Sequence, residues 1–298
     1  MSPHPLPLGI VSNCWSALLS GENALEAQCR RALEAGYSVI ELRQRALAEA
    51  EQEVVGDPRP WPLPNRLARL RERLPELQFH LAVEAPFISG ALELRDPYLH
   101  RCIEAAEALG DAAFLRLVDP TPTAPGVAHE ESVDELGQLL GDFAGLCWNS
   151  SVRLVIENAR QPVALVRRIA RRAAFTMPRS APRIGICWDP VNMISVADND
   201  EDPVVVAATF LPAGPELKDE LAEVHYKQRA NGAVLPVVGE GEVDWAGALA
   251  ALWERRYGGP FLFEIPPGPD IWERLETSRG YVEALARHLP ASGPKESP

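Results

Sequence analysis

Four residues in the second half of the sequence have the types and the spacing to hold a divalent cation. They are Glu157, Asp189, His225 and Glu264, and each stands at the end of a short apolar run that reads as a strand. Consecutive members lie roughly 30–40 residues apart, about the length of one strand–helix–strand unit. A parallel barrel brings the carboxyl ends of its strands to one rim, where such barrels build their active sites. Three carboxylates and an imidazole at that rim predict a site for a hard divalent metal ion.

Each of these four residues also has a purely structural explanation. Glu157 and Glu264 could be buried ion-pair partners or solvated strand ends. His225 could be a hydrogen-bonded core histidine, and Asp189 could cap a helix that starts at Pro190. However, a carboxylate directly after Leu-Val-Ile or Phe-Leu-Phe is costly to bury without a partner. The arrangement of all four at strand ends therefore favours the metal site.

Six further residues are expected to face this site and to contact a substrate. They are His80, Arg116, Lys227, Trp15, Trp188 and Asn192. The histidine and the arginine lie in predicted strands, and the lysine has the same strand parity as His225. Both tryptophans lie near the C-terminal end of a strand, where they could line a substrate pocket. The structural alternatives are hydrogen bonding inside the barrel, a solvated strand end and simple packing.

The elements that must position these side chains alternate along the whole sequence. Predicted strands cover Leu8–Val11, Val39–Leu42, Leu77–Val83, Phe114–Val118, Arg153–Ile156, Ile184–Trp188, Ala222–Tyr226 and Phe261–Phe263. Predicted helices cover Glu22–Ala35, Pro62–Leu74, Pro97–Leu109, Ser132–Leu146, Pro162–Ala174, Val204–Leu211, Asp244–Arg256 and Glu276–His288. Eight such pairs predict an α/β protein with a parallel sheet, and they match a single (β/α)8 TIM barrel over residues 1–290. A doubly wound open sheet is the alternative fold. It is less favoured because no Gly-rich turn, as found in dinucleotide-binding sheets of this kind, follows the first strand.

The composition limits the classes of function. Hydrophobic residues make up 46% and charged residues 24%, as in an ordinary globular protein. A net charge of −13 argues against general nucleic-acid binding, because phosphates favour Lys and Arg. No apolar stretch approaches the ~20 residues of a membrane span, and the start, MSPHPLPLG, lacks the features of a signal peptide. We therefore expect a cytoplasmic protein without disulfides, with a disordered tail at residues 291–298, and with its oligomeric state open.

Five short motifs, in this order, make the sequence resemble a known family. They are Val155–Asn158, Cys187–Asn192, Val224–Lys227, Val238–Trp245 and Leu262–Glu264. The chain resembles the xylose isomerase-like TIM barrel superfamily, which includes sugar isomerases, ketose 3-epimerases, inosose and dehydroshikimate dehydratases, and endonuclease IV. The resemblance covers nearly the whole sequence and implies the same barrel fold.

The resemblance also implies roles for the four residues at the strand ends. In that superfamily the corresponding residues bind one divalent cation, so Glu157, Asp189, His225 and Glu264 are the expected ligands of Mn, Mg, Co or Zn. The two glutamates are the expected catalytic residues. The sequence departs from many relatives at two positions, with Asn192 in place of a histidine and Gln228 in place of an aspartate.

The activity implied in this way is metal-dependent isomerisation or epimerisation of a small sugar or polyhydroxy carbonyl compound. The glutamates would transfer a proton through an enediolate that the metal ion stabilises. A metal-dependent dehydratase is the main alternative, because inosose dehydratases have a comparable His-x-Lys stretch and here His225 precedes Lys227 by two residues. An endonuclease IV-like phosphodiesterase and a barrel that has lost its activity are the remaining alternatives.

Overall fold

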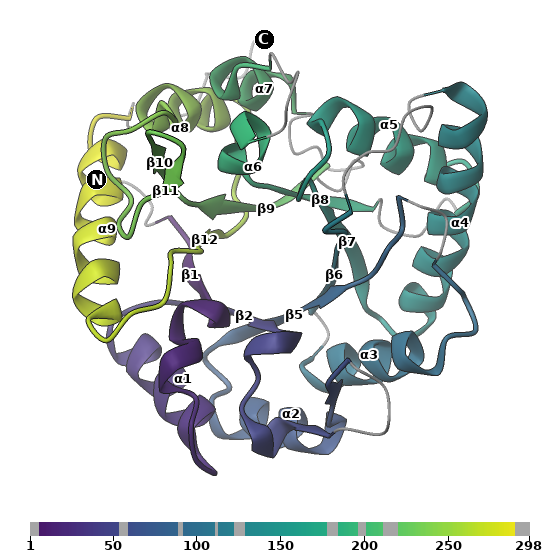
Figure 1. Ribbon diagram of the computed structural model, residues 1–298, viewed down its shortest axis with the longest axis horizontal. Helices are drawn as coiled ribbons and strands as arrows, with labels where there is room; N and C mark the ends of the chain where they lie inside the picture. Colours follow the sequence, from purple (N-terminus) through teal and green to yellow (C-terminus); the bar gives the residue numbers. More distant parts are fainter. Residues whose placement is uncertain are drawn as a thin grey trace, which may run out of the picture.

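Eight parallel strands close into a barrel with helices around it (Figure 1). The computed structural model describes residues 6–53, 59–88, 92–110, 113–121, 129–177, 184–195, 201–210 and 220–289. The barrel strands, in chain order, are β1 Leu8–Val11, β2 Val39–Arg43, β5 Gln78–Glu84, β6 Phe114–Val118, β7 Arg153–Glu157, β8 Gly185–Trp188, β9 Leu221–Tyr226 and β12 Phe261–Phe263. Because β1 pairs with both β2 and β12, the sheet has no open edge. The predicted TIM barrel is confirmed and the open sheet is excluded.

Apart from the short α6, the helices form an outer ring in Figure 1 and fall close to their predicted positions. They are α1 Ala24–Glu34, α2 Pro64–Arg73, α3 Pro97–Ala108, α4 Glu130–Asn149, α5 Val163–Ala173, α6 Pro190–Ser195, α7 Pro203–Thr209, α8 Trp245–Glu254 and α9 Ile271–Ala286. The last helix begins earlier than the predicted Glu276. Its first residue, Ile271, is fully buried on the same side as Leu275, and this burial places the start of the helix there.

Several short elements were not predicted because they are too short to show a hydrophobic period. They are the 3₁₀ helices η1 Ser12–Leu18, η2 Gln44–Ala46 and η3 Glu49–Glu51, the pairs β3 Gln52–Glu53 with β4 Trp61–Pro62 and β10 Arg229–Ala230 with β11 Ala233–Val234, and helix α6. Most of them follow the C-terminal ends of barrel strands, so they shape the rim where the four predicted ligands lie.

The space between barrel and helices is apolar, but the inside of the barrel carries charge. The third residue of four barrel strands is polar and fully buried, namely Glu41, His80, Arg116 and Glu223. Branched apolar residues usually fill such a barrel. A charged interior must pair its groups with one another, since an unpaired buried charge is very costly.

Three further expectations concern the cysteines, membrane-spanning helices and the C-terminal tail. All five cysteines are free and buried. Among the described parts of the chain, no helix is both long and apolar enough to cross a membrane. The predicted disordered tail, residues 291–298, lies outside the described residues.

The tightest backbone contact in the barrel explains one glycine. A methyl group on Gly9 of β1 would lie 2.4 Å from the carbonyl oxygen of Val39 and 2.4 Å from Cδ2 of Leu262, on the two neighbouring strands. By contrast, a methyl group on Gly145 of α4 would meet no atom within 4 Å.

We therefore expect opposite effects from the same substitution at these two sites. Gly9→Ala should destabilise the protein by about 1–3 kcal/mol or more, because the backbone of β2 cannot move away. Gly145→Ala should stabilise it by about 0.5–1 kcal/mol through helix propensity. Urea denaturation followed by far-UV circular dichroism measures both, and a neutral Gly9→Ala would contradict the barrel closure described here.

Candidate metal centre

The side chains of Glu157, Asp189, His225 and Glu264 meet at the C-terminal rim of the barrel. Each offers one ligand atom, and the four atoms all lie within 4.8 Å of one another. They come from the ends of β7, β8, β9 and β12, and all four side chains are buried. Nδ1 of His225 lies 3.8 Å from Oε1 of Glu157, 3.9 Å from Oδ2 of Asp189 and 3.2 Å from Oε2 of Glu264. We call this group the four-residue site.

Both glutamates of the site have one oxygen held by the protein and the other facing His225. Oε2 of Glu157 accepts a hydrogen bond from Nη1 of Arg116. Oε1 of Glu264 accepts from Nδ2 of Asn13 at 2.8 Å and from Nη1 of Arg43 at 2.7 Å. These donors fix the direction of each carboxylate, so the second oxygen points to the centre of the site.

Asp189 is held in the same way by the backbone. Its Oδ1 accepts hydrogen bonds from the amides of Val191 at 2.9 Å and Asn192 at 3.2 Å, at the start of α6. Its own amide donates to Oδ1 of Asn158 at 2.8 Å, and the Asn158 side-chain amide donates to the Asp189 carbonyl at 2.9 Å. Thus Asp189 holds the first turn of α6 with one oxygen and offers the other to the site. The helix cap and the metal ligand, which the sequence left as alternatives for Asp189, are therefore compatible.

The geometry and the charge of these residues fit a divalent cation. Two ligand atoms that each lie about 2.0–2.2 Å from one ion are roughly 3–3.5 Å apart. Of the separations from Nδ1 of His225, that to Glu264 (3.2 Å) lies in this range, and those to Glu157 (3.8 Å) and Asp189 (3.9 Å) are somewhat longer. Neither ring nitrogen of His225 has a well-aligned hydrogen-bond partner among the described residues, although the ring is fully buried. A buried polar atom without a partner is rare, so this imidazole is suited to coordinate an ion.

The charged groups around the site form two clusters of ion pairs. Arg116 contacts Glu41, Glu157 and Glu223. Arg43 and Lys227 contact Glu264, and Lys227 also contacts Asp189. Burial acts to raise the pKa of Glu264, but Lys227, His225 and Arg43 outweigh it and hold that pKa well below its usual range. Glu264 is therefore ionised at neutral pH.

Arg116 lies deeper than expected and contacts acids of the protein. Its Nε donates to Oε2 of Glu41 at 2.6 Å, its Nη2 pairs with the other oxygen of Glu41, and its Nη1 pairs with Glu157. Its Nε also lies 3.4 Å from Oε1 of Glu223. Burial would raise the pKa of Glu41, but the guanidinium outweighs it and lowers that pKa. Since its side chain is fully buried, Arg116 positions Glu157, and its predicted contact with substrate stays a prediction.

Three other predicted substrate residues are also fully buried. Nδ1 of His80 lies 3.0 Å from Oε2 of Glu223, away from the four-residue site. Trp15 is stacked on Trp272, with ring centroids 5.7 Å apart. Nε1 of Trp188 lies 2.9 Å from Sδ of Met193, which is buried in the core. Their roles in substrate binding stay predictions, and their burial favours packing and structural hydrogen bonding.

The other two predicted substrate residues do lie at the four-residue site. Nζ of Lys227 is 2.6 Å from Oδ2 of Asp189 and 2.5 Å from Oε2 of Glu264. Nδ2 of Asn192 donates to Oε1 of Glu157 at 3.0 Å, and its side chain is only partly buried. These two side chains supply hydrogen-bond donors beside the predicted ligands.

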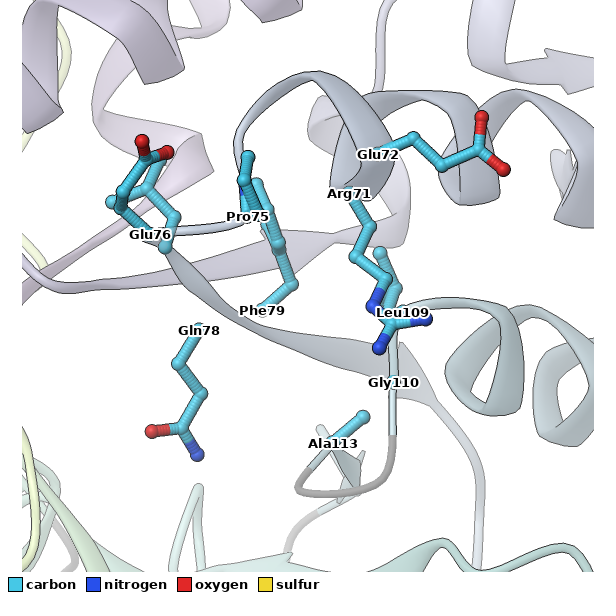
Figure 2. Close-up of a pocket in the computed structure, with 10 residues that line it drawn as sticks. Arg71, Glu72, Pro75, Glu76, Gln78, Phe79, Leu109, Gly110 and Ala113 are labelled. Atoms are coloured by element: carbon cyan, nitrogen blue, oxygen red, sulfur yellow. The ribbon is translucent and has the colours of Figure 1, made fainter.

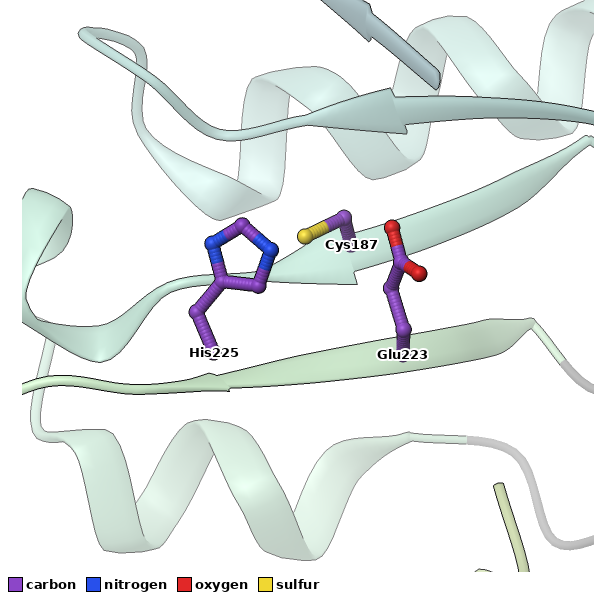
Figure 3. Close-up of side chains that lie close together, drawn as sticks. All are labelled: Cys187, Glu223 and His225. Atoms are coloured by element: carbon purple, nitrogen blue, oxygen red, sulfur yellow. The ribbon is translucent and has the colours of Figure 1, made fainter. Parts of the chain in front are cut away.

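A second group of possible ligands shares His225 with the site. In Figure 3 the thiol of Cys187 lies between the imidazole of His225 and the carboxylate of Glu223, and the three ligand atoms lie within 4.8 Å of one another. Burial raises the pKa of Cys187 well above its usual value. Without a metal ion the thiol is therefore protonated at neutral pH, and it lies beside the ring of His225.

Sequence reasoning missed several residues that hold this centre together. Asn13, Arg43, Cys187 and Glu223 were not singled out as site residues. The strand parity that Glu223 shares with His225 could have indicated that it points into the barrel. Nothing in the local sequence links Asn13 or Arg43 to Glu264, which lies more than two hundred residues away.

Gln228, at the position where the family resemblance implies an aspartate, holds the segment from Gly239 to Val243 in place. Its Nε2 donates to the carbonyl oxygens of Gly239 at 2.7 Å and Val243 at 3.1 Å, and its Oε1 accepts from the amide of Val243 at 3.0 Å. The side chain is fully buried. The amide can donate and accept at once, so this residue stabilises the loop next to Lys227 without adding charge.

A cavity of about 450 Å³ lies at the opposite end of the barrel (Figure 2). Its lining comes from the C-terminal ends of α2 and α3 and from the starts of β5 and β6, and it includes Arg71, Glu76 and Gln78. None of the predicted site residues lines this cavity. Because the active sites of parallel barrels form at the other end, we do not assign the chemistry to it.

The comparisons with known proteins agree with this architecture. The family model described as xylose isomerase-like TIM barrel matches residues 29–282. The sequence matches no curated protein. A structure of L-ribulose 3-epimerase is 16% identical, with a TM-score of 0.67, over 99% of this chain and 100% of that one.

Two other solved structures are similar over almost their whole length. A xylose isomerase-like TIM barrel protein from Mycobacterium smegmatis, in complex with magnesium, is 14% identical with a TM-score of 0.64, over 97% of this chain and 100% of that one. A probable 3-DHS dehydratase from Bacillus anthracis is 11% identical with a TM-score of 0.63, over 93% and 99%. At such identities the similarity shows a shared fold.

The buried position of Arg116 leads to a stability prediction. Arg116→Met should destabilise the metal-free protein by about 3–5 kcal/mol, because it leaves the buried acids without their cation. Arg172→Met removes an exposed pair with Asp134 and should cost less than about 1 kcal/mol. Urea denaturation in EDTA measures the difference, and equal midpoints for the two variants would contradict the role given to Arg116.

Proposed function

The chain belongs to the xylose isomerase-like TIM barrel family, and from this premise we propose that it is a divalent-metal-dependent isomerase or epimerase. The proposed substrate is a small sugar or a related polyhydroxy carbonyl compound. The observation that carries the proposal is the convergence of three carboxylate oxygens on one buried imidazole nitrogen at the barrel rim. A similar structure is that of an L-ribulose 3-epimerase, which supports this class of reaction.

The proposed ligands are Glu157, Asp189, His225 and Glu264, with one ion of Mn, Mg, Co or Zn. Three oxygens and one imidazole suit Mn²⁺ or Mg²⁺, and one similar structure was solved with magnesium. When bound, the ion supplies Lewis-acid stabilisation of negative charge on the oxygens of the substrate.

The protein's own groups would move the proton. Glu157 and Glu264 each keep one oxygen anchored and one facing the centre. One of them removes the proton from the carbon next to the substrate carbonyl, and the same residue or the other returns it. Such a base contributes about 10²–10⁴-fold to the rate. The guanidinium of Arg116 orients the carboxylate of Glu157. The side chains of Asn192 and Lys227 offer hydrogen-bond donors to substrate oxygens.

The proposal includes the expected partners and location. A small carbohydrate-like substrate is the proposed partner, and neither nucleic acid nor membrane is expected to bind. The negative charge of the chain supports this expectation, since the chain carries 42 acidic and 29 basic residues. A cytoplasmic location is proposed, and assembly into a homo-oligomer stays open.

A metal-dependent dehydratase is the second candidate. It begins with the same proton removal, after which a hydroxyl group leaves from the next carbon. Lys227 favours this candidate, because its ammonium lies at the site and could donate a proton to the leaving oxygen. A similar structure, the probable 3-DHS dehydratase, supports it as well.

Two substitutions test the role of the glutamates. We expect Glu157→Gln and Glu264→Gln each to lower proton exchange by at least about 10²-fold, because the amide cannot act as the base. Glu130→Gln, on the exposed start of α4, is the matched control and should leave exchange unchanged. The exchange rate is measured as deuterium uptake from D₂O at the carbon beside the carbonyl. The substrates are a panel of ketoses and inososes, with Mn²⁺ or Mg²⁺ present. Near-normal exchange in both variants would exclude this mechanism.

Mass spectrometry of the same reactions separates the two candidate functions. An isomerase or epimerase leaves the mass of the product equal to that of the substrate, whereas a dehydratase releases one water. Elemental analysis adds the metal content: about one ion per chain is expected in the native protein and none in His225→Ala. An absence of metal from all samples, even after reconstitution, would contradict both functions.

A further inference from the structure

Lys227 contacts the same oxygens that the proposed metal ion needs. Its Nζ lies 2.6 Å from Oδ2 of Asp189 and 2.5 Å from Oε2 of Glu264. These two oxygens are the ones that face Nδ1 of His225, at 3.9 and 3.2 Å. The ammonium group therefore occupies two of the four ligand atoms of the four-residue site.

Neither carboxylate has a second oxygen to offer instead. Oδ1 of Asp189 accepts the amides of Val191 and Asn192 at the start of α6. Oε1 of Glu264 is bound by Asn13 and Arg43. A cation that binds Asp189 and Glu264 must therefore use the oxygens that Lys227 holds.

The side chain of Lys227 can move while its backbone stays in place. The Lys227 carbonyl accepts a hydrogen bond from Nε1 of Trp245 at 2.9 Å, and the next residue, Gln228, is bound to Gly239 and Val243. The Lys227 side chain itself is 13% exposed, unlike the fully buried His225. Part of the Lys227 side chain therefore already contacts solvent, and the ammonium group can move in that direction.

The two cations repel each other strongly at this distance. A group 2.6 Å from an oxygen and an ion about 2.1 Å from the same oxygen are separated by less than about 5 Å. At such a distance in a buried site, like charges interact much more strongly than in water. Both cannot bind these oxygens without a large loss of affinity for one of them.

We propose that Lys227 is an internal counter-ion of the metal site, which holds Asp189 and Glu264 together in the metal-free protein and must leave them when the metal ion binds. The inference rests on the proposed function, because it presumes the four-residue site as the metal site. It predicts that the lysine opposes metal binding and stabilises the metal-free fold at the same time. A lysine that only supports the structure would not oppose the metal ion.

The test is calorimetric titration of the full chain with Mn²⁺, using wild type, Lys227→Met and Lys227→Arg. Methionine keeps much of the side-chain length but removes the charge, and arginine keeps the charge. We expect Lys227→Met to bind Mn²⁺ at least about tenfold more tightly, and Lys227→Arg to bind no more tightly than wild type. In EDTA the melting temperature of Lys227→Met should fall, and saturating Mn²⁺ should remove this difference.

A measurement on the wild-type protein covers the case in which the variant does not fold. The chain has only three lysines, Lys218, Lys227 and Lys295, so acetylation of each can be followed by mass spectrometry. Mn²⁺ should increase the rate of acetylation of Lys227 relative to the other two, because the ammonium is released from its carboxylates. A decrease, or no change, would overturn the proposal.

The outcomes also separate this inference from the proposed function. If Mn²⁺ binds wild type and Lys227→Met equally well, or binds the variant more weakly, the counter-ion role is wrong and the metal-dependent function stands. If Mn²⁺ binds neither protein, the metal site itself is wrong, and the counter-ion role is overturned with it.

Discussion

The buried ion pairs of Arg116 with Glu41 and Glu157 are the interaction on which the site depends. Charged groups inside a closed barrel lose their hydration, and only close pairing offsets that cost. Arg116 meets this requirement for acids from two other strands at once. By holding one oxygen of Glu157, it also directs the second oxygen toward His225. The stability of the barrel interior and the geometry of the rim are therefore parts of one network.

The same construction is repeated at the other carboxylates. Asp189 is anchored by the first turn of α6, and Glu264 by side chains that follow β1 and end β2. In each case one carboxylate oxygen is held by hydrogen bonds and the other faces His225. The proposed ligands are therefore organised before an ion binds. This organisation costs free energy, because the carboxylate oxygens that face one another repel. Lys227 offsets part of that repulsion, and a divalent ion would do so more fully.

The order and type of the barrel elements could be predicted because they depend on local patterns. Apolar runs of three to seven residues between amphipathic helices are visible in the sequence, and all eight barrel strands lie where those runs occur. The start of α9 was misplaced, since Ile271 stands five residues ahead of the predicted start, next to a turn. The segments η1 and α6 were missed because helices of seven and six residues are too short to show a clear hydrophobic period. Both border the rim, so the shape of the site was less predictable than the fold.

The sequence by itself determined that four ligand-type residues would meet, because the carboxyl ends of parallel barrel strands must lie on one rim. It also determined the family, through five motifs in order. Only the tertiary structure decided what the partners of these residues are. Arg116 and His80 were expected near a substrate; both lie deep in their strands and contact buried acids, and their contact with a substrate stays a prediction. Asn13 and Arg43 reach Glu264 because β1 lies between β12 and β2 in the closed barrel. Such contacts depend on closure and register between segments far apart in the chain, and no local pattern records them.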